Sequence, residues 1–135
     1  MQQKIEILWN ELRPINKETW PYHNEEKDPA EYRFDDDGAI IKKSEYGKET
    51  EFGYTIDHMF PVSKGGDDNI ENLRLLHWRN NKLKADDFPT FSYDTARTLE
   101  NDAFRNESKS RPRPTFSNEV LLKLCSLYPG ANRYC

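Results

Sequence analysis

Apolar and polar positions along the first third of the chain predict two short elements separated by irregular chain. Apolar residues at positions 5, 7, 8, 9 and 12 have the spacing of an amphipathic helix, and Pro14 ends it. Residues 14–38 carry no sustained pattern and are expected to be irregular. Asp37-Gly38 then gives a turn signal before the apolar run 39–42, which is typical of a strand.

The middle of the chain predicts two strands followed by a helix. Residues 54–62 alternate as a half-buried strand does, with Pro61 at an exposed end. A loop at 63–68 surrounds Gly65-Gly66, and residues 73–76 form a second short strand. The polar, cationic run from 78 to about 85 predicts a helix with cations near its C-terminus, where the helix dipole favours them.

Two further helices are expected after Pro89. Residues 93–105 have a helical pattern, with Asp94 or Thr95 as the N-cap. A final helix at 120–128 is opened by Ser117-Asn118-Glu119 and stopped by Pro129-Gly130.

Composition fits one small domain with an aromatic core. The 135 residues are 35% hydrophobic, 33% charged and 13% aromatic. No run of 18 apolar residues is present, so no membrane span is expected, and the N-terminus does not read as a signal peptide. Cys125 and Cys135 can pair only within the C-terminal tail, and a single pair is no disulfide framework. A cytoplasmic or other reducing compartment is therefore the default expectation.

Charge is distributed unevenly around a net value of −4. Residues 21–51 carry ten acids and five bases, whereas 61–84 carry five bases and three acids, and 105–133 carry six bases and two acids. One interpretation is solvated surface throughout. The other places DNA on the two basic regions, away from the acidic one.

Asp57 and His58 are the residues that suggest chemistry. Phosphodiester hydrolysis needs an activated water and a counter-charge for the phosphorane, and a neutral imidazole and an oxygen-bound cation can supply these. Successive strand residues point to opposite faces, so the pair needs a bend or bulge near Pro61 to serve one centre. Asn81 on the following helix can return a second oxygen ligand.

The order of these parts resembles that of the HNH nucleases. Residues 52–87 contain, in sequence, Asp57-His58, Pro61, Gly65-Gly66, Asn72-Leu73 and Asn80-Asn81-Lys82. The resemblance implies an α+β fold with a ββα-metal core at about 38–88. It is flanked by an N-terminal helix at 4–13 and a helical extension at 90–130 in a single domain of residues 1–135.

The resemblance also implies roles for four residues. His58 would be the general base, Asp57 and Asn81 the ligands of one divalent cation, and Asn72 the residue that orders the loop and the base. This His-Asn-Asn variant keeps an oxygen ligand at the last position, which favours Mg²⁺ or Mn²⁺. It lacks the Cys-x-x-Cys pairs of zinc-braced relatives.

Other polar residues near the motif leave alternatives open. His77 is either a third ligand or phosphate contact, or a partly buried imidazole at the end of a strand. Asn80 competes with Asn81, but helical geometry lets only one of them face the metal. Five cations are either phosphate contacts or solvated surface: Lys64, Arg74, Arg79, Lys82 and Lys84.

The sequence therefore predicts a metal-dependent endonuclease that cuts DNA. The alternatives are a nucleic-acid-binding module with an inactive site, or a protein-interaction module that is a subunit of a larger nuclease or defence system. The pattern leaves open whether the protein forms a homodimer or binds another protein.

Overall fold

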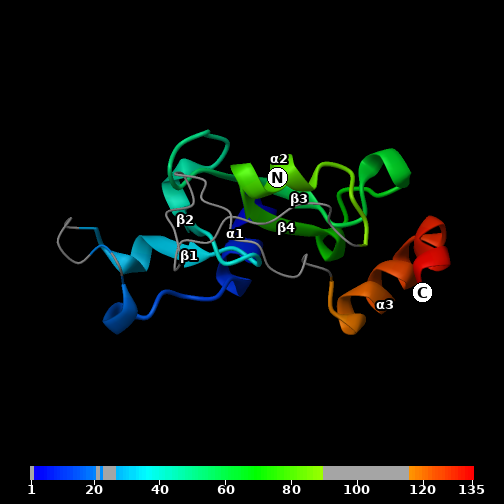
Figure 1. The fold of residues 1–135 in the computed structure, drawn as a ribbon, viewed down its shortest axis with the longest axis horizontal. Coiled ribbons are helices and arrows are strands. Elements are labelled where there is room, and N and C mark those ends of the chain that lie inside the picture. The colour runs from blue at the N-terminus through cyan, green and yellow to red at the C-terminus, as the bar shows by residue number, and fades with distance from the viewer. Residues whose placement is uncertain (1, 21, 23–26, 90–115) are drawn as a thin grey trace.

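The computed structural model has helices and two small antiparallel sheets, which confirms the α+β class. It describes residues 2–20, 22, 27–89 and 116–135. The β3–β4 pair lies at the centre of the molecule, with the β1–β2 hairpin on one side of it and α3 on the other (Figure 1). The expected helix at 93–105 lies outside the described residues.

A ββα unit forms the centre of the fold. Strand β3 (Tyr54–His58) pairs antiparallel with β4 (Leu73–His77), and α2 (Trp78–Lys84) follows directly. Helix α2 packs on one face of the pair, since Asn81 donates to Thr55 Oγ1 at 2.6 Å. This is the arrangement expected from the resemblance.

Strand β3 is shorter than the sequence predicts. The expected strand ran from 54 to 62, but regular pairing stops at His58, opposite Leu73. Beyond it the Phe60 N–H donates to the Asn72 side chain at 2.7 Å, and Pro61 has no N–H to offer a neighbouring strand. The chain then bends into the loop that carries the 3₁₀ turn Val62–Lys64.

Strands β1 (Tyr32–Phe34) and β2 (Ile40–Lys42) form a hairpin that sequence patterning finds only in part. Strand β2 was predicted, but β1 falls in a stretch expected to be irregular. Three residues are too few for alternation to be recognised. The turn depends on Asp35, whose Oδ1 accepts the N–H groups of Asp37 at 2.9 Å and Ala39 at 2.8 Å.

Helix α1 (Gln2–Glu11) covers the face of the β3–β4 pair opposite α2. Tyr54 and Ile56 point to this face because strand residues alternate. The buried cluster here is continuous from the helix to both sheets: Ile5, Leu8, Trp9, Leu12, Ile41, Tyr54, Leu73 and Leu75. One face of β3 is therefore packed in the core against α1, and the other face contacts α2.

Helix α3 (Asn118–Leu127) packs beside the β3–β4 loop. It starts two residues before the predicted helix, and the Ser117 hydroxyl accepts the Val120 N–H at 3.2 Å as an N-cap. Leu124 and Tyr128 join Phe60 and Phe88 in a second buried cluster. The C-terminal extension is thus attached to the same loop that follows His58.

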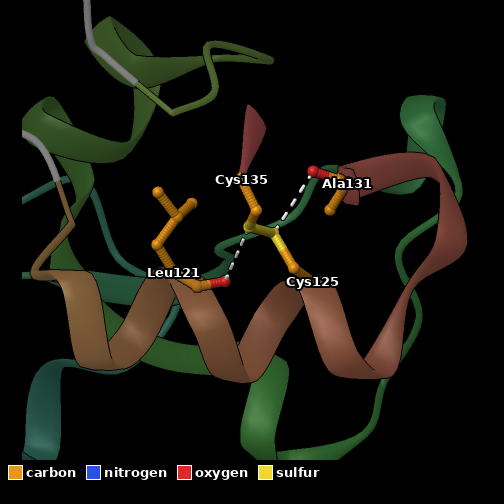
Figure 2. The surroundings of a disulfide bond; sticks show 4 residues. All are labelled: Leu121, Cys125, Ala131 and Cys135. Atoms are coloured by element: carbon orange, nitrogen blue, oxygen red, sulfur yellow. Dashed lines mark hydrogen bonds between the residues drawn. A yellow bond between two sulfur atoms is a disulfide. The ribbon is translucent and has the colours of Figure 1, made fainter. Parts of the chain in front are cut away.

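A disulfide joins Cys125 in α3 to Cys135 and holds the 3₁₀ segment Pro129–Tyr134 against the helix (Figure 2). It is the pairing within the tail that the sequence allowed. The sulfurs lie 3.3 Å from the Ala131 carbonyl oxygen and 3.7 Å from that of Leu121. These are contacts rather than hydrogen bonds, because bonded sulfurs carry no proton. Closing a loop of this length stabilises a fold by roughly 2–3 kcal/mol.

None of the helices in the described ranges has both the length and the apolar character needed to cross a membrane.

Candidate active site

Asp57 is buried between two cations. Its Oδ2 accepts the Arg74 Nε–H at 2.8 Å, and its Oδ1 lies 3.1 Å from Lys84 Nζ. Arg74 is the cross-strand neighbour of Asp57, whereas Lys84 comes from the last turn of α2. Burial lowers the pKa of Lys84, and the charge of Asp57 opposes that shift. The carboxylate is therefore compensated within the protein.

Arg74 and Lys84 are buried. Both were candidates for phosphate contacts, but their side chains are only 8% and 1% exposed. Each cation instead balances the carboxylate of Asp57. Buried charges of this kind are tolerated when paired, and the pairing depends on a fold that no local pattern reveals.

His58 is the last residue of β3 and is partly exposed. Its Nε2 lies 2.7 Å from Asp68 Oδ1, in the loop after Gly65-Gly66. With the Nε2 proton donated to Asp68, Nδ1 is the nitrogen left to accept a proton. The sequence pattern identifies Asp68 only as a loop residue. Its place just after the two glycines is the one signal that could have suggested that it lies near His58.

Asn72 fixes the loop that follows His58. Its Oδ1 accepts the Phe60 N–H at 2.7 Å, and its Nδ2 donates to the carbonyls of Phe60 and Asp67, both at 3.0 Å. Gly66 permits this closeness, since a Cβ there would lie 1.8 Å from the Phe60 oxygen. The buried amide thus ties both ends of the loop to β4.

Asn80 and Asn81 make hydrogen bonds to different parts of the fold, as their different directions around α2 lead one to expect. Asn81 Nδ2 donates to Thr55 Oγ1 and to the Ile56 carbonyl, at 2.6 and 3.1 Å, so its amide oxygen is not used in these bonds. Asn80 is fully buried and donates to Asp35 Oδ2 at 3.2 Å. Only Asn81 lies beside Asp57 and His58.

A cavity of about 200 Å³ brings the predicted residues together. Asp57, His58 and Asn81 all line it, with the remaining wall formed by Ile56, Pro61, Val62, Ser63, Ala85 and Asp86. The β3–β4 pairing is regular through Asp57 and His58. Alternation along this regular strand points the two side chains to opposite faces, and the bend comes only after His58, at Met59 and Phe60.

The donor set suits a hard cation that keeps part of its water shell. Carboxylate and amide oxygens are the ligands that Mg²⁺ prefers, and it commonly binds through one or two of them plus water. Among the residues that the structure describes, no group of three His, Cys, Asp or Glu side chains is close enough to hold a metal alone. Asp57 and Asn81 carry such oxygens, but both Asp57 oxygens are already paired, Oδ1 with Lys84 and Oδ2 with Arg74.

His77 lies away from the cavity in a buried hydrogen-bond network. Its Nε2 lies 2.7 Å from the Glu51 carbonyl oxygen, and its Nδ1 accepts the Arg79 N–H at 3.1 Å as the N-cap of α2. Its backbone N–H donates to Asp35 Oδ2 at 2.9 Å. Of the two readings of His77, this geometry fits the imidazole at the end of a strand.

The other predicted cations stay near the surface. Arg79 and Lys82 lie over the Trp78 ring, 5.5 and 5.3 Å from its centroid, and Lys82 also pairs with Glu49 at 2.6 Å. Lys64 is exposed in the turn Val62–Lys64.

Asp35 is a structural residue that sequence reasoning missed, and it gives a first prediction. Asp35→Ala removes the acceptor of four N–H groups: the backbone donors of Asp37, Ala39 and His77 and the side chain of Asn80. Each buried donor left unpaired costs about 1–3 kcal/mol, so we expect the free energy of unfolding to fall by about 4 kcal/mol or more. Urea unfolding of the variant and the wild type measures this loss of stability.

The neighbouring exposed carboxylate is the control, and pH gives a second readout. Asp36→Ala should cost no more than about 1 kcal/mol; equal losses in the two variants would contradict the role of Asp35.

Burial and then the charge of Asp37 raise the pKa of Asp35 from 3.8 to about 7. Between these values the folded protein holds a proton that the unfolded chain has released. This contribution to stability should therefore fall as pH rises, and Asp35→Ala should remove the dependence.

Residues 41–87 match the family model described as HNH endonuclease. This confirms the resemblance for that segment, which contains β3, β4, α2 and all four residues with predicted roles. No curated protein matches the chain. No solved structure matches it either. The matched family consists of nucleases, so a nuclease-type function on nucleic acid is indicated.

Proposed function

We propose that the protein is a metal-dependent endonuclease that hydrolyses phosphodiester bonds in DNA. The observation that supports the proposal is the cavity at the end of β3, which Asp57, His58 and Asn81 all line. An imidazole, a carboxylate and an amide oxygen around one hollow are the groups that hydrolysis of a phosphodiester needs.

Asp57 and Asn81 would hold one divalent cation, Mg²⁺ or Mn²⁺. Such an ion supplies a counter-charge for the phosphorane and for the leaving oxygen. The two hydrogen bonds that Asn81 Nδ2 makes to β3 fix the amide and leave its oxygen out of both bonds. The Arg74 bond holds the other side of Asp57 in place.

His58 would remove the proton from the attacking water. Asp68 accepts a hydrogen bond from Nε2, which favours the tautomer with a free Nδ1. Asn72 would support this by fixing the loop that carries Asp67 and Asp68.

Lys84 should compete with the cation, which gives a second prediction. Its ammonium lies 3.1 Å from Asp57 Oδ1, one of the oxygens that a cation would use. Lys84→Met removes a buried positive charge beside the site, so Mn²⁺ should bind about tenfold more tightly or better. Isothermal titration with Mn²⁺ measures this without any reaction. Equal or weaker binding than wild type would rule out the competition, and Lys82→Met, an exposed change on the same helix, is the control.

The second candidate is a nucleic-acid-binding module with an HNH-like fold but no activity, either alone or as the subunit of a larger nuclease. The pairing of both Asp57 oxygens with buried cations favours it, because the site is neutralised without a metal. The net charge of −4 speaks against strong binding to DNA as the whole function.

Digestion of supercoiled plasmid separates the two. The wild-type protein is incubated with Mg²⁺, Mn²⁺ or a chelator, and the ends of the products are mapped. We expect cutting with the metals only, leaving 5′-phosphate and 3′-hydroxyl ends, as the resemblance implies. Retained DNA binding without any cutting would favour the module instead.

A further inference from the structure

We propose that the 3₁₀ segment Pro129–Tyr134 and the turn Val62–Lys64 form a second nucleic-acid site, which binds the sugar-phosphate backbone beside the cut phosphate. The inference deepens the proposed function and rests on it for the position of the cut. It concerns the part of the chain that the family match does not cover, together with one turn inside the match.

The site is a hollow of about 450 Å³ on the C-terminal side of the loop. Six residues line it: Phe60, Lys64, Pro129, Gly130, Arg133 and Tyr134. Two of these are cations and two are aromatic, and none is acidic. Phe60 is buried and Tyr134 is partly buried against Phe88, so the two cations are the groups that a phosphate would meet here.

Both cations are available to a ligand. Several exposed lysines of the described chain are paired with carboxylates, among them Lys43 with Glu6 and Lys123 with Glu71. Neither Lys64 nor Arg133 is in a salt bridge within the described ranges. One guanidinium nitrogen of Arg133 donates to the Tyr134 hydroxyl at 2.7 Å, and the other N–H groups of the fork can reach a phosphate.

The hollow is built onto the active-site loop rather than formed by a loose tail. Tyr128 stacks on Phe60 at 5.3 Å and donates a hydrogen bond to Asp67. Gly130 lies close to the turn, since a Cβ there would be 3.3 Å from the Lys64 carbonyl oxygen. The disulfide ties the end of this segment to α3 (Figure 2).

Residues of the turn Val62–Lys64 line both this hollow and the catalytic cavity. Val62 and Ser63 line the catalytic side, whereas Lys64 lines the other. A strand with one phosphate in the catalytic cavity therefore passes the turn and meets Lys64 and Arg133 next. Those cations would bind a neighbouring phosphate of the same strand, with Tyr134 beside it.

Binding without chemistry tests this. A labelled DNA duplex is titrated with protein in a chelator, by fluorescence anisotropy, at several salt concentrations. Arg133→Gln and Lys64→Gln should each weaken binding and lower the slope of log affinity against log salt by about 1, because each removes one phosphate contact. Lys17→Gln, the same charge change in the 3₁₀ turn at the opposite end of the molecule in Figure 1, should leave both unchanged.

The outcomes separate this inference from the proposed function. If Arg133→Gln and Lys64→Gln bind as Lys17→Gln does, the second site is wrong, even when the wild type cuts plasmid. If both variants lose the slope while the wild type never cuts with Mg²⁺ or Mn²⁺, the second site stands and the endonuclease proposal fails. Both substitutions are at exposed side chains, so thermal melting should show intact folding.

Discussion

His58→Ala should lower the rate of DNA cleavage about 10²–10⁴-fold, the usual contribution of a positioned general base. The imidazole is partly exposed and contacts Asp68 through one bond, so its removal should leave folding nearly unchanged. The measurement is single-turnover cleavage of a labelled duplex with Mn²⁺, where chemistry rather than product release is observed.

Two comparisons make the His58 result specific. Asp68→Asn keeps the imidazole but weakens the group that orients it, so cleavage should fall less than in His58→Ala. The affinity for Mn²⁺ should match wild type in both variants. Unchanged turnover in His58→Ala would refute its role as the base.

Asp57→Ala should destabilise the protein by about 3–5 kcal/mol, because it leaves Arg74 and Lys84 buried without their common partner. The loss should appear in urea unfolding without any metal. A protein with 135 residues has a total stability of about 5–15 kcal/mol, so this variant will be partly unfolded under mild stress.

That expectation changes how Asp57 variants are interpreted. Loss of cleavage in Asp57→Ala would not by itself show a metal ligand, since the fold is also weakened. Asp57→Ala combined with Lys84→Met removes one uncompensated charge and should recover part of the stability. An Asp57→Ala protein as stable as wild type would contradict the burial of this ion-pair cluster.

The ββα core was predictable because its signals are local. Alternation, two glycines and a cationic helix follow one another within residues 54–85, and the structure has β3, β4 and α2 in that order. The end of β3 was placed four residues too late, since the pattern cannot show that the Asn72 side chain replaces the strand ladder at Phe60. Strand β1 was too short to be recognised.

The partners of the site residues were less predictable, because they come from distant parts of the chain. Local spacing pointed to the four motif residues, and Asp57, His58 and Asn81 line one cavity. It did not show that Lys84 and Arg74 neutralise Asp57, or that Asp35, 42 residues before His77, accepts the His77 backbone N–H. Such pairings depend on tertiary contacts, and no spacing rule reports them.

The most direct test of the account is to locate Mn²⁺ in crystals of the protein by anomalous scattering. We expect one peak in the cavity at the end of β3, in contact with Asp57 and Asn81 and beside His58, with Lys84 moved away from the carboxylate. A protein that cuts DNA with Mn²⁺ while its only peak lies elsewhere, and Lys84 still holds Asp57, would contradict it.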